Sequence, residues 1–184
     1  MPKLFGEMLL SVNIGLFYGS TTCYTEMAAE KIKAELDPLI APASVELFDI
    51  KDTPLHKIAQ FEKVILGIST WDFGELQEDW ESSWDDVNDV DFTGKTVALY
   101  GLGDQFGYAD WFQDALGMLH DLILPLGAEI TGYWPNQGYE FTASKALTED
   151  AEFFVGLSLD DENQFAQTDA RIQAWCASIL DDLR

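Results

Sequence analysis

Short apolar segments alternate with segments of helical periodicity along most of the chain. The apolar segments are rich in β-branched and aromatic residues, which is typical of parallel strands buried on both faces. They cover residues 12–18, 44–50, 64–69, 96–101 and, as a last pair, 128–134 with 153–159. This alternation predicts an α/β protein in which helices cover both faces of a parallel sheet.

Three segments between and after these strands have the period of an amphipathic helix. Residues 23–36 place Ala28, Ile32 and Leu36 on one stripe, and residues 108–124 form a second stripe of the same kind. A third helix is predicted from about Thr168, the expected N-cap, to the end of the chain.

Residues 135–152 break the alternation, because they are polar, rich in turn-forming residues and too short for a helical crossover. They predict an insertion that splits or flanks the last strand. The chain contains no internal repeat or linker, so we expect a single domain over residues 1–184. Residues 1–11 are expected to be an N-terminal extension.

The charge is strongly unbalanced, with 33 acidic against 10 basic residues and a net charge of -23. Binding to a nucleic-acid backbone depends on basic residues and is therefore excluded. The acidity serves either solubility or docking to basic protein partners. Two cysteines, Cys23 and Cys176, make no disulfide framework, and we expect a reducing cytoplasm. No apolar run has the length of a membrane span, and no membrane insertion is expected.

Ligands of open α/β sheets bind beyond the carboxyl ends of the strands, which directs attention to three loops. The first follows Gly19 and places Ser20, Thr21, Thr22 and Thr25 at the start of a helix. Hydroxyls and free N–H groups at a helix N-terminus bind phosphate, although simple capping is the alternative reading. No Lys or Arg lies between Tyr18 and Lys31, so neutral donors alone would hold the anion.

The second and third loops are rich in aromatic residues and glycines. Residues 69–75 contain Trp71, which either packs in the core or offers its face to a ligand. Residues 101–108 contain three glycines together with Asp104 and Tyr108. A planar aromatic ligand with a phosphate tail accounts for all three loops, with its ring between Trp71 and Tyr108. Asp104, or the backbone beside it, would accept a hydrogen bond from an imide N–H. These properties describe flavin mononucleotide (FMN).

From residue 13 onward the chain resembles a long-chain flavodoxin. The matching motifs are FYGSTTCYTE, TWDFGELQEDW, GLGDQFGYADWFQDALG, GYWPNQGYEF and FVGLSLDDENQ. Cys23 with Tyr24 departs from the usual glycine and resembles the second flavodoxin type of some proteobacteria. The resemblance implies a flavodoxin-like three-layer sandwich with a five-stranded parallel sheet of order 2-1-3-4-5, interrupted in its last strand by the long-chain insertion.

The resemblance also implies residue roles. Ser20, Thr22 and Thr25 match the phosphate hydroxyls, Trp71 and Tyr108 the stacking aromatics, and Asp104 the residue at the pyrimidine edge. The peptide between Asp72 and Phe73 matches the one that turns its carbonyl toward flavin N5. The expected FMN-binding set is Ser20, Thr21, Thr22, Cys23, Tyr24, Thr25, Ser69, Thr70, Trp71, Asp72, Phe73, Gly74, Leu102, Gly103, Asp104 and Tyr108.

The implied function is that of a monomeric, low-potential one-electron carrier rather than an enzyme, using the quinone, semiquinone and hydroquinone states of FMN. A basic flavoprotein reductase of the ferredoxin/flavodoxin-NADP type is the expected donor, and redox enzymes are the acceptors. The acidic residues 78–91 are either a solvated helix face or a docking surface. An FMN-dependent quinone or NAD(P)H oxidoreductase remains the alternative. A response-regulator receiver is disfavoured because the acidic cluster and phosphoacceptor that it needs are missing.

Overall fold

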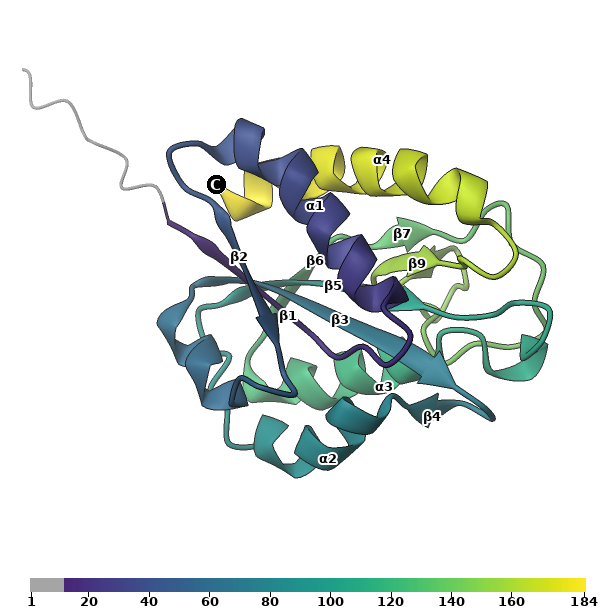
Figure 1. The fold of residues 1–184 in the computed structure, drawn as a ribbon. Coiled ribbons are helices and arrows are strands. Elements are labelled where there is room, and N and C mark those ends of the chain that lie inside the picture. The colour runs from purple at the N-terminus through teal and green to yellow at the C-terminus, as the bar shows by residue number, and fades with distance from the viewer. Residues whose placement is uncertain (1–11) are drawn as a thin grey trace, which may run out of the picture.

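A parallel sheet with the strand order β2-β1-β3-β5-β6 lies at the centre of the molecule (Figure 1). The computed structural model describes residues 12–184, and the extension expected at residues 1–11 lies outside them. The strands are β1 (Ile14–Tyr18), β2 (Val45–Asp49), β3 (Lys63–Trp71), β5 (Thr96–Leu102) and β6 (Glu129–Thr131). Because β4 (Glu75–Leu76) is only a short antiparallel partner of β3, this arrangement confirms the predicted order 2-1-3-4-5.

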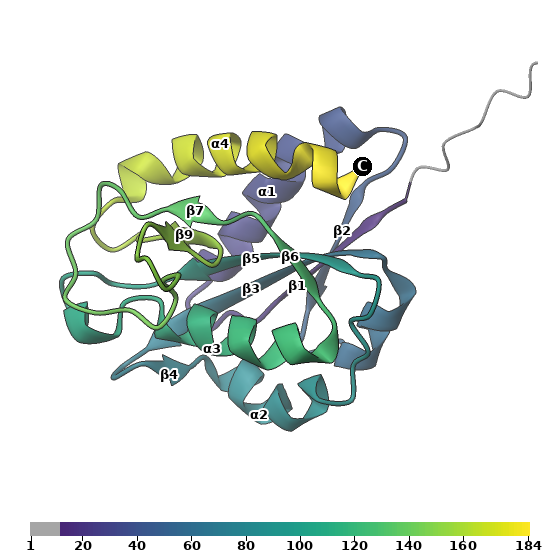
Figure 2. The same ribbon diagram turned by 180° about the vertical axis from the view of Figure 1, so that it is seen from behind.

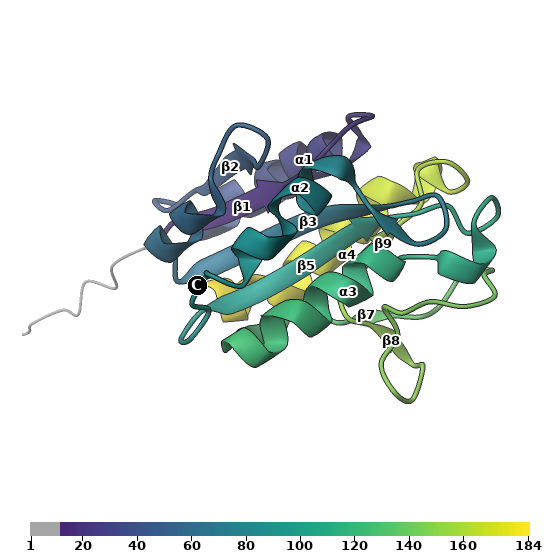
Figure 3. The same cartoon turned by 90° about the horizontal axis from the view of Figure 1, so that it is seen from below.

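The last position of the sheet is shared by two short strands. β6 pairs with the first half of β5, where Glu129 lies opposite Thr96, and β9 (Leu157–Leu159) pairs with the second half, where Leu157 lies opposite Tyr100. Between them, β7 (Trp134–Pro135), labelled in Figure 2, and β8 (Phe153–Phe154), labelled in Figure 3, form a separate antiparallel ladder. The chain thus leaves the sheet after Thr131 and returns to it at Leu157.

Two helices cover each face of the sheet. α1 (Tyr24–Ile40) and α4 (Phe165–Leu183) lie side by side on one face, while α2 (Glu78–Val87) and α3 (Asp114–Ile123) cover the other (Figures 1 and 3). Alternate residues of β1 serve the two faces: Leu16 packs with the α1 and α4 residues, and Phe17 packs with those of α2 and α3. Short 3-10 helices complete the fold at η1 (Leu55–Gln60), η2 (Ala109–Trp111) and η3 (Leu124–Leu126).

The helix predicted over residues 108–124 is wrong as a continuous element. It divides into η2 and α3 because Gln113 adopts a left-handed conformation with φ of 62°. The Gln113 side chain is fully buried, and its Nε2 donates to the carbonyls of Gly101 at 3.2 Å and Leu159 at 3.0 Å. A tertiary contact that joins β5 to β9 therefore overrides the helical periodicity.

The predicted N-cap of the last helix is also wrong. α4 begins at Phe165 after Gln164, so that Thr168 lies inside the helix and is buried. Its hydroxyl donates to the Asp161 carboxylate, which connects the helix to the preceding loop. The first helix starts at Tyr24, close to the prediction, and continues to Ile40.

Among the residues described, no helix combines the length and apolarity that crossing a membrane requires. Both cysteines are free thiols: Cys23 is exposed, whereas Cys176 is buried in the layer that α4 forms.

Candidate functional site: a pocket at the carboxyl ends of the strands

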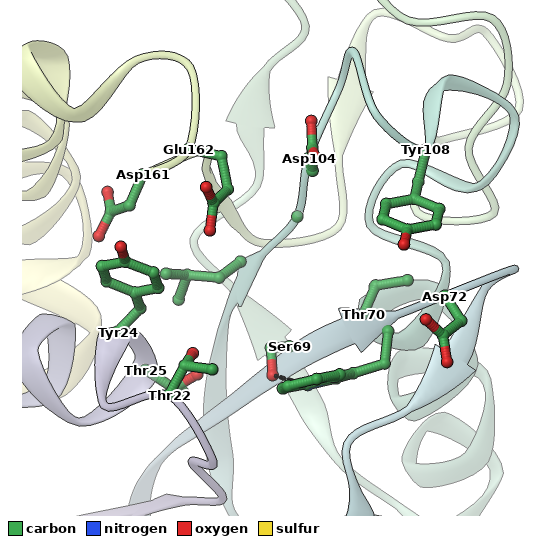
Figure 4. Close-up of a pocket in the computed structure, with 13 residues that line it drawn as sticks. Thr22, Tyr24, Thr25, Ser69, Thr70, Asp72, Asp104, Tyr108, Asp161 and Glu162 are labelled. Carbon is green, nitrogen blue, oxygen red and sulfur yellow. Dashed lines mark hydrogen bonds between the residues drawn. The ribbon is translucent and has the colours of Figure 1, made fainter.

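The three loops singled out in the sequence meet around one pocket beyond the carboxyl ends of β1, β3 and β5 (Figure 4). Its walls come from four segments of the chain. The lining residues are Thr22, Tyr24, Thr25, Ser69, Thr70, Trp71, Asp72, Leu102, Gly103, Asp104, Tyr108, Asp161 and Glu162. The structure therefore assembles segments that are separated by about thirty to fifty residues each in the chain, because parallel strands of one sheet bring their carboxyl ends together.

Five residues of the expected binding set do not line this pocket. They are Ser20, Thr21, Cys23, Phe73 and Gly74. Conversely, Asp161 and Glu162 line it although the sequence assigned them no role. They follow β9, and its place beside β5 carries their loop to the pocket. The sequence signal was the motif FVGLSLDDENQ, but only the split of the last strand shows where that motif lies.

The first loop presents uncommitted hydrogen-bond donors. The first backbone hydrogen bond of α1 is donated by Met27 to the carbonyl of Cys23 at 2.8 Å, so the N–H groups of Tyr24, Thr25 and Glu26 precede the helical ladder. The Ser20 hydroxyl oxygen is buried and has no hydrogen-bond partner in the described part of the chain. Unused donors at a helix N-terminus match an anionic ligand. The residues present therefore fit a phosphate group.

Two features hold the first loop in this shape. Cys23 has a φ of 69°, in the left-handed region where glycine is the ordinary residue. The Tyr100 hydroxyl donates to the carbonyl of Thr25 at 2.8 Å, which supports the first turn of α1 from beneath. Burial, reinforced by the nearby Tyr18, raises the pKa of Tyr100 well above its usual value, so this hydroxyl keeps its proton.

The second loop, residues 69–75, contains two hydroxyl oxygens that accept hydrogen bonds from other parts of the protein. Ser69 accepts a hydrogen bond from the Trp71 indole N–H at 3.0 Å, which fixes the edge of that ring. Thr70 accepts from the N–H of Ala115 at 3.0 Å and so satisfies a free donor at the start of α3. Both hydroxyl oxygens act as acceptors in these contacts, so this loop offers a ligand the Trp71 side chain together with the O–H donors of Ser69 and Thr70.

A tight turn follows Trp71. Trp71 pairs with Glu75 across the turn, and both Asp72 (φ 41°) and Gly74 (φ 84°) have left-handed backbones. A positive φ at a residue other than glycine is uncommon and is frequent at functional sites. The Asp72–Phe73 peptide thus lies in a strained turn beside the pocket.

Phe73 does not line the pocket but lies next to Tyr108, which does. Its side chain is 68% exposed and makes edge contacts with Tyr108, with ring centroids 6.4 Å apart, and with Trp111 at 5.1 Å. Phe73 thus contacts Tyr108, one of the three aromatic residues that line the pocket.

The carboxylate of Asp104 holds the third loop together. Its Oδ1 accepts from the N–H groups of Phe106 at 3.1 Å and Gly107 at 2.7 Å, and from Asn163 Nδ2 at 2.8 Å. In Figure 4 this carboxylate points away from Ser69 and Thr70. The side chain is committed to the loop, which leaves the backbone beside Asp104 to face a ligand.

A buried carboxylate connects the third loop to the segment after β9. Asp160 is fully buried and accepts hydrogen bonds from Gln105 through its N–H at 3.1 Å and its Nε2 at 2.7 Å. It also accepts from the N–H of Asn163 at 3.0 Å. Gln105 Oε1 in turn accepts from the N–H of Glu140 in the insertion at 2.6 Å. Charge-assisted hydrogen bonds of this kind fix the relative positions of the segments that they join.

Negative charge surrounds the pocket. Asp72, Asp104, Asp161 and Glu162 line it, and no Lys, Arg or His is among the lining residues described. Burial raises the pKa of Asp161, opposed by the Thr168 hydrogen bond and by Lys31. Lys31 itself pairs with Asp169 at 2.6 Å. The pocket therefore disfavours any form of a ligand that gains negative charge.

Replacing the buried carboxylate tests whether it positions the loops. We expect Asp160→Asn to lower the free energy of unfolding by about 1–3 kcal/mol, because an amide leaves one buried donor without an acceptor. Hydrogen exchange at the N–H groups of Gln105 and Asn163 should become faster. Urea unfolding and amide exchange measure both effects, and the exposed Asp52→Asn is the matched control. Wild-type stability and exchange in Asp160→Asn would contradict this role.

Comparisons with known proteins agree with this architecture. The flavodoxin family model matches residues 16–175. Flavodoxin 2 of Escherichia coli (strain K12) is 55% identical over 172 residues, which cover 94% of this chain and 97% of the relative. A flavodoxin of Picosynechococcus sp. is 46% identical over 166 residues, covering 90% and 95%. The crystal structure of Fusobacterium nucleatum flavodoxin bound to flavin mononucleotide has a TM-score of 0.86 at 29% identity, covering 94% of this chain and 99% of that one. The chain therefore belongs to the flavodoxin family.

Proposed function

We propose that this protein carries single electrons at low potential on one non-covalently bound FMN. The observation behind this proposal is the pocket itself, which joins free donors at a helix N-terminus, three aromatic side chains and four carboxylates. Members of the flavodoxin family are electron-transfer proteins rather than enzymes. When bound, FMN supplies a ring that accepts and releases one electron at a time.

The phosphate end would be held by the first loop. Ser20, Thr22 and Thr25 provide hydroxyls, and the N–H groups that precede the ladder of α1 provide further donors. The unpartnered, buried oxygen of Ser20 supports this assignment, because such an atom is costly unless a ligand completes it.

The ring end would be held by Trp71 and Tyr108, which both line the pocket. Aromatic side chains bury roughly 150–250 Å² each, and at about 25 cal/mol per Å² their contact with a planar ring contributes several kcal/mol before ordering costs. The Ser69 hydroxyl orients the Trp71 indole through the hydrogen bond at 3.0 Å. A backbone carbonyl oxygen of Gly103 or Asp104 would accept a hydrogen bond from the imide N–H of the ring.

The carboxylates would lower the second reduction potential. One negative charge about 8 Å from an added charge, at an effective dielectric constant of about 20, costs about 2 kcal/mol. For one electron this corresponds to about 90 mV. The Asp72–Phe73 peptide lies in the strained turn beside the pocket and would accept a hydrogen bond from a protonated ring nitrogen with its carbonyl oxygen. Both effects favour two one-electron reduction steps at different potentials.

We infer that a basic reductase of the ferredoxin/flavodoxin-NADP type delivers the electrons and that redox enzymes accept them. The acidic α2 helix supports this inference, because its first turn contains Glu78, Asp79 and Glu81 and no basic residue lies between Lys63 and Lys95. A single-sign surface steers an oppositely charged partner toward it. The NAD(P)H oxidoreductase alternative has no such support, because the carboxylates that line the pocket would repel the further phosphate groups of a nicotinamide nucleotide placed beside the ring.

Stepwise reduction tests the proposed function. Under anaerobic titration with dithionite, the FMN-loaded protein should take up two electrons in separate steps, with a long-wavelength absorption band that rises and then falls. The negative pocket should place the second step at the lower potential. A single two-electron step, or a protein that binds no FMN, would contradict the proposal.

Truncation of the aromatic side chains tests how the ring is held. Trp71→Ala and Tyr108→Ala should each raise the dissociation constant for FMN by about 10- to 100-fold, because apolar contact area with the ring is lost. Quenching of FMN fluorescence measures the affinity. Tyr133→Ala removes a comparably exposed aromatic side chain that does not line the pocket, and it should leave the affinity unchanged. Wild-type affinity in both pocket variants would exclude the stacking assignment.

Charge reversal tests the docking surface. Glu81→Lys combined with Asp85→Lys should slow reduction by a basic ferredoxin/flavodoxin-NADP reductase by about 5- to 10-fold at low salt, and the difference should shrink as salt screens the charges. Stopped-flow kinetics at several ionic strengths measure this. Asp181→Lys combined with Asp182→Lys makes the same double charge reversal on α4, on the opposite face of the sheet, as a control. Equal effects of reversal on α2 and α4 would show that net charge, and not α2, steers the encounter.

A further inference from the structure

We propose that Gln77 is a positioning residue that holds the phosphate loop, residues 20–25, in its binding conformation and thereby sets the preference for a phosphorylated flavin over an unphosphorylated one. The proposal rests on the proposed function of the pocket. Gln77 does not line that pocket, and its effect would reach the ligand through Thr21.

Gln77 is fully buried although it is polar, and both ends of its amide are used. Its Oε1 accepts from the N–H groups of Asp79 at 3.2 Å and Trp80 at 3.3 Å, which caps α2. Its Nε2 donates to Thr21 Oγ1 at 3.0 Å and to Asp79 Oδ2 at 2.7 Å. One amide thus joins the start of an acidic helix to the phosphate loop, a segment 56 positions away in the chain.

Thr21 is the middle one of three consecutive hydroxyl residues, and it is anchored on the side of α2. Its oxygen accepts from Gln77 and its proton is directed to Glu78 Oε1 at 3.5 Å. Its two neighbours are not used in this way: the Ser20 oxygen is buried without a partner, and Thr22 lines the pocket. Anchoring the middle hydroxyl therefore restricts the directions of the two that flank it.

The backbone leading into the loop packs directly on the same amide. A Cβ atom added to Gly19 would lie 2.2 Å from Gln77 Oε1 and 2.9 Å from Trp80 Cδ1, so only glycine permits this approach. Trp80 is fixed in turn, because its indole N–H donates to the carbonyl of Gly67 on β3 at 2.8 Å. Gln77 therefore sits between a rigid part of the sheet and the start of the loop.

A phosphate loop that is already ordered before binding should affect the affinity for the phosphate end of the ligand and not for its ring. A loop already held in its binding conformation loses less conformational freedom when the phosphate binds, which increases affinity. The aromatic residues at the ring end, Trp71 and Tyr108, make no hydrogen bond with Gln77. The ratio of the dissociation constants of riboflavin and FMN isolates the phosphate contribution, because the two ligands share the ring and the ribityl chain.

The experiment compares this ratio among variants of the flavin-free protein, titrated with FMN and with riboflavin by fluorescence quenching. Gln77→Met and Thr21→Val should each reduce the preference for FMN by about 3- to 10-fold, the range expected for one lost hydrogen bond. The double variant should lose no more than either single variant, because both changes break the same contact. Thr21→Ser retains the hydroxyl and should keep the wild-type ratio.

Ser82→Ala is the matched control on the same helix. The Ser82 side chain is exposed and its hydroxyl donates to the Glu78 carbonyl at 2.9 Å, without contact to the phosphate loop. It should keep the wild-type ratio. If Gln77 serves only as the cap of α2, Gln77→Met will lower stability and weaken both ligands equally, and that outcome overturns the proposal.

Three further outcomes distinguish the proposal from its alternatives. Thr21 is exposed, so Thr21→Val decides the question even if Gln77→Met does not fold, and a wild-type ratio in Thr21→Val overturns the proposal. Additive losses in the double variant overturn it as well. Failure of the wild-type protein to bind FMN would instead contradict the proposed function, which keeps the two conclusions separate.

Discussion

The constraint on which the proposed site depends is that the phosphate must be held although no positively charged side chain is among the described residues that line the pocket. Neutral donors are individually weaker than a lysine or arginine, so they must be many, unused by the protein and correctly directed. The fold meets these requirements with the first turn of α1, where N–H groups precede the helical ladder and the Ser20 oxygen has no partner among the described residues. Tyr100 supports this turn through Thr25, and Gln77 holds it through Thr21.

The absence of a base among the lining residues also shapes the electrostatics of the pocket. Asp72, Asp104, Asp161 and Glu162 keep the site negative, and no cation of the phosphate loop offsets them. In the proposed binding mode, a positive side chain at the phosphate would strengthen binding but would also stabilise an anionic reduced ring, since one pocket would hold both. In the proposed function, neutral phosphate binding and a low reduction potential would both follow from the lack of a basic side chain among the described lining residues.

Hydrogen bonds of buried side-chain amides and of one buried carboxylate fix the relative positions of the loops around the pocket. Gln113 joins β5 to β9, Asp160 joins the third loop to the segment after β9, and Gln105 extends this contact to the insertion. Each of these polar groups is fully or almost fully buried, where an unmet hydrogen bond is costly. The insertion between β6 and β9 is therefore connected to the pocket and is more than a surface loop.

The sequence by itself determined the succession of strands along the chain, the places of α1, α3 and α4, and the three loops that form the pocket, because burial leaves a periodic pattern along each element and parallel strands bring their carboxyl ends together. The tertiary structure alone decided the details that depend on contacts between distant segments. It broke the helix at Gln113, directed the Asp104 carboxylate into its own loop and turned Thr21 toward α2. It also brought Asp161 and Glu162 into the pocket. Local periodicity reports which side of an element is buried, but it contains no information on which distant donor or acceptor a polar side chain will meet.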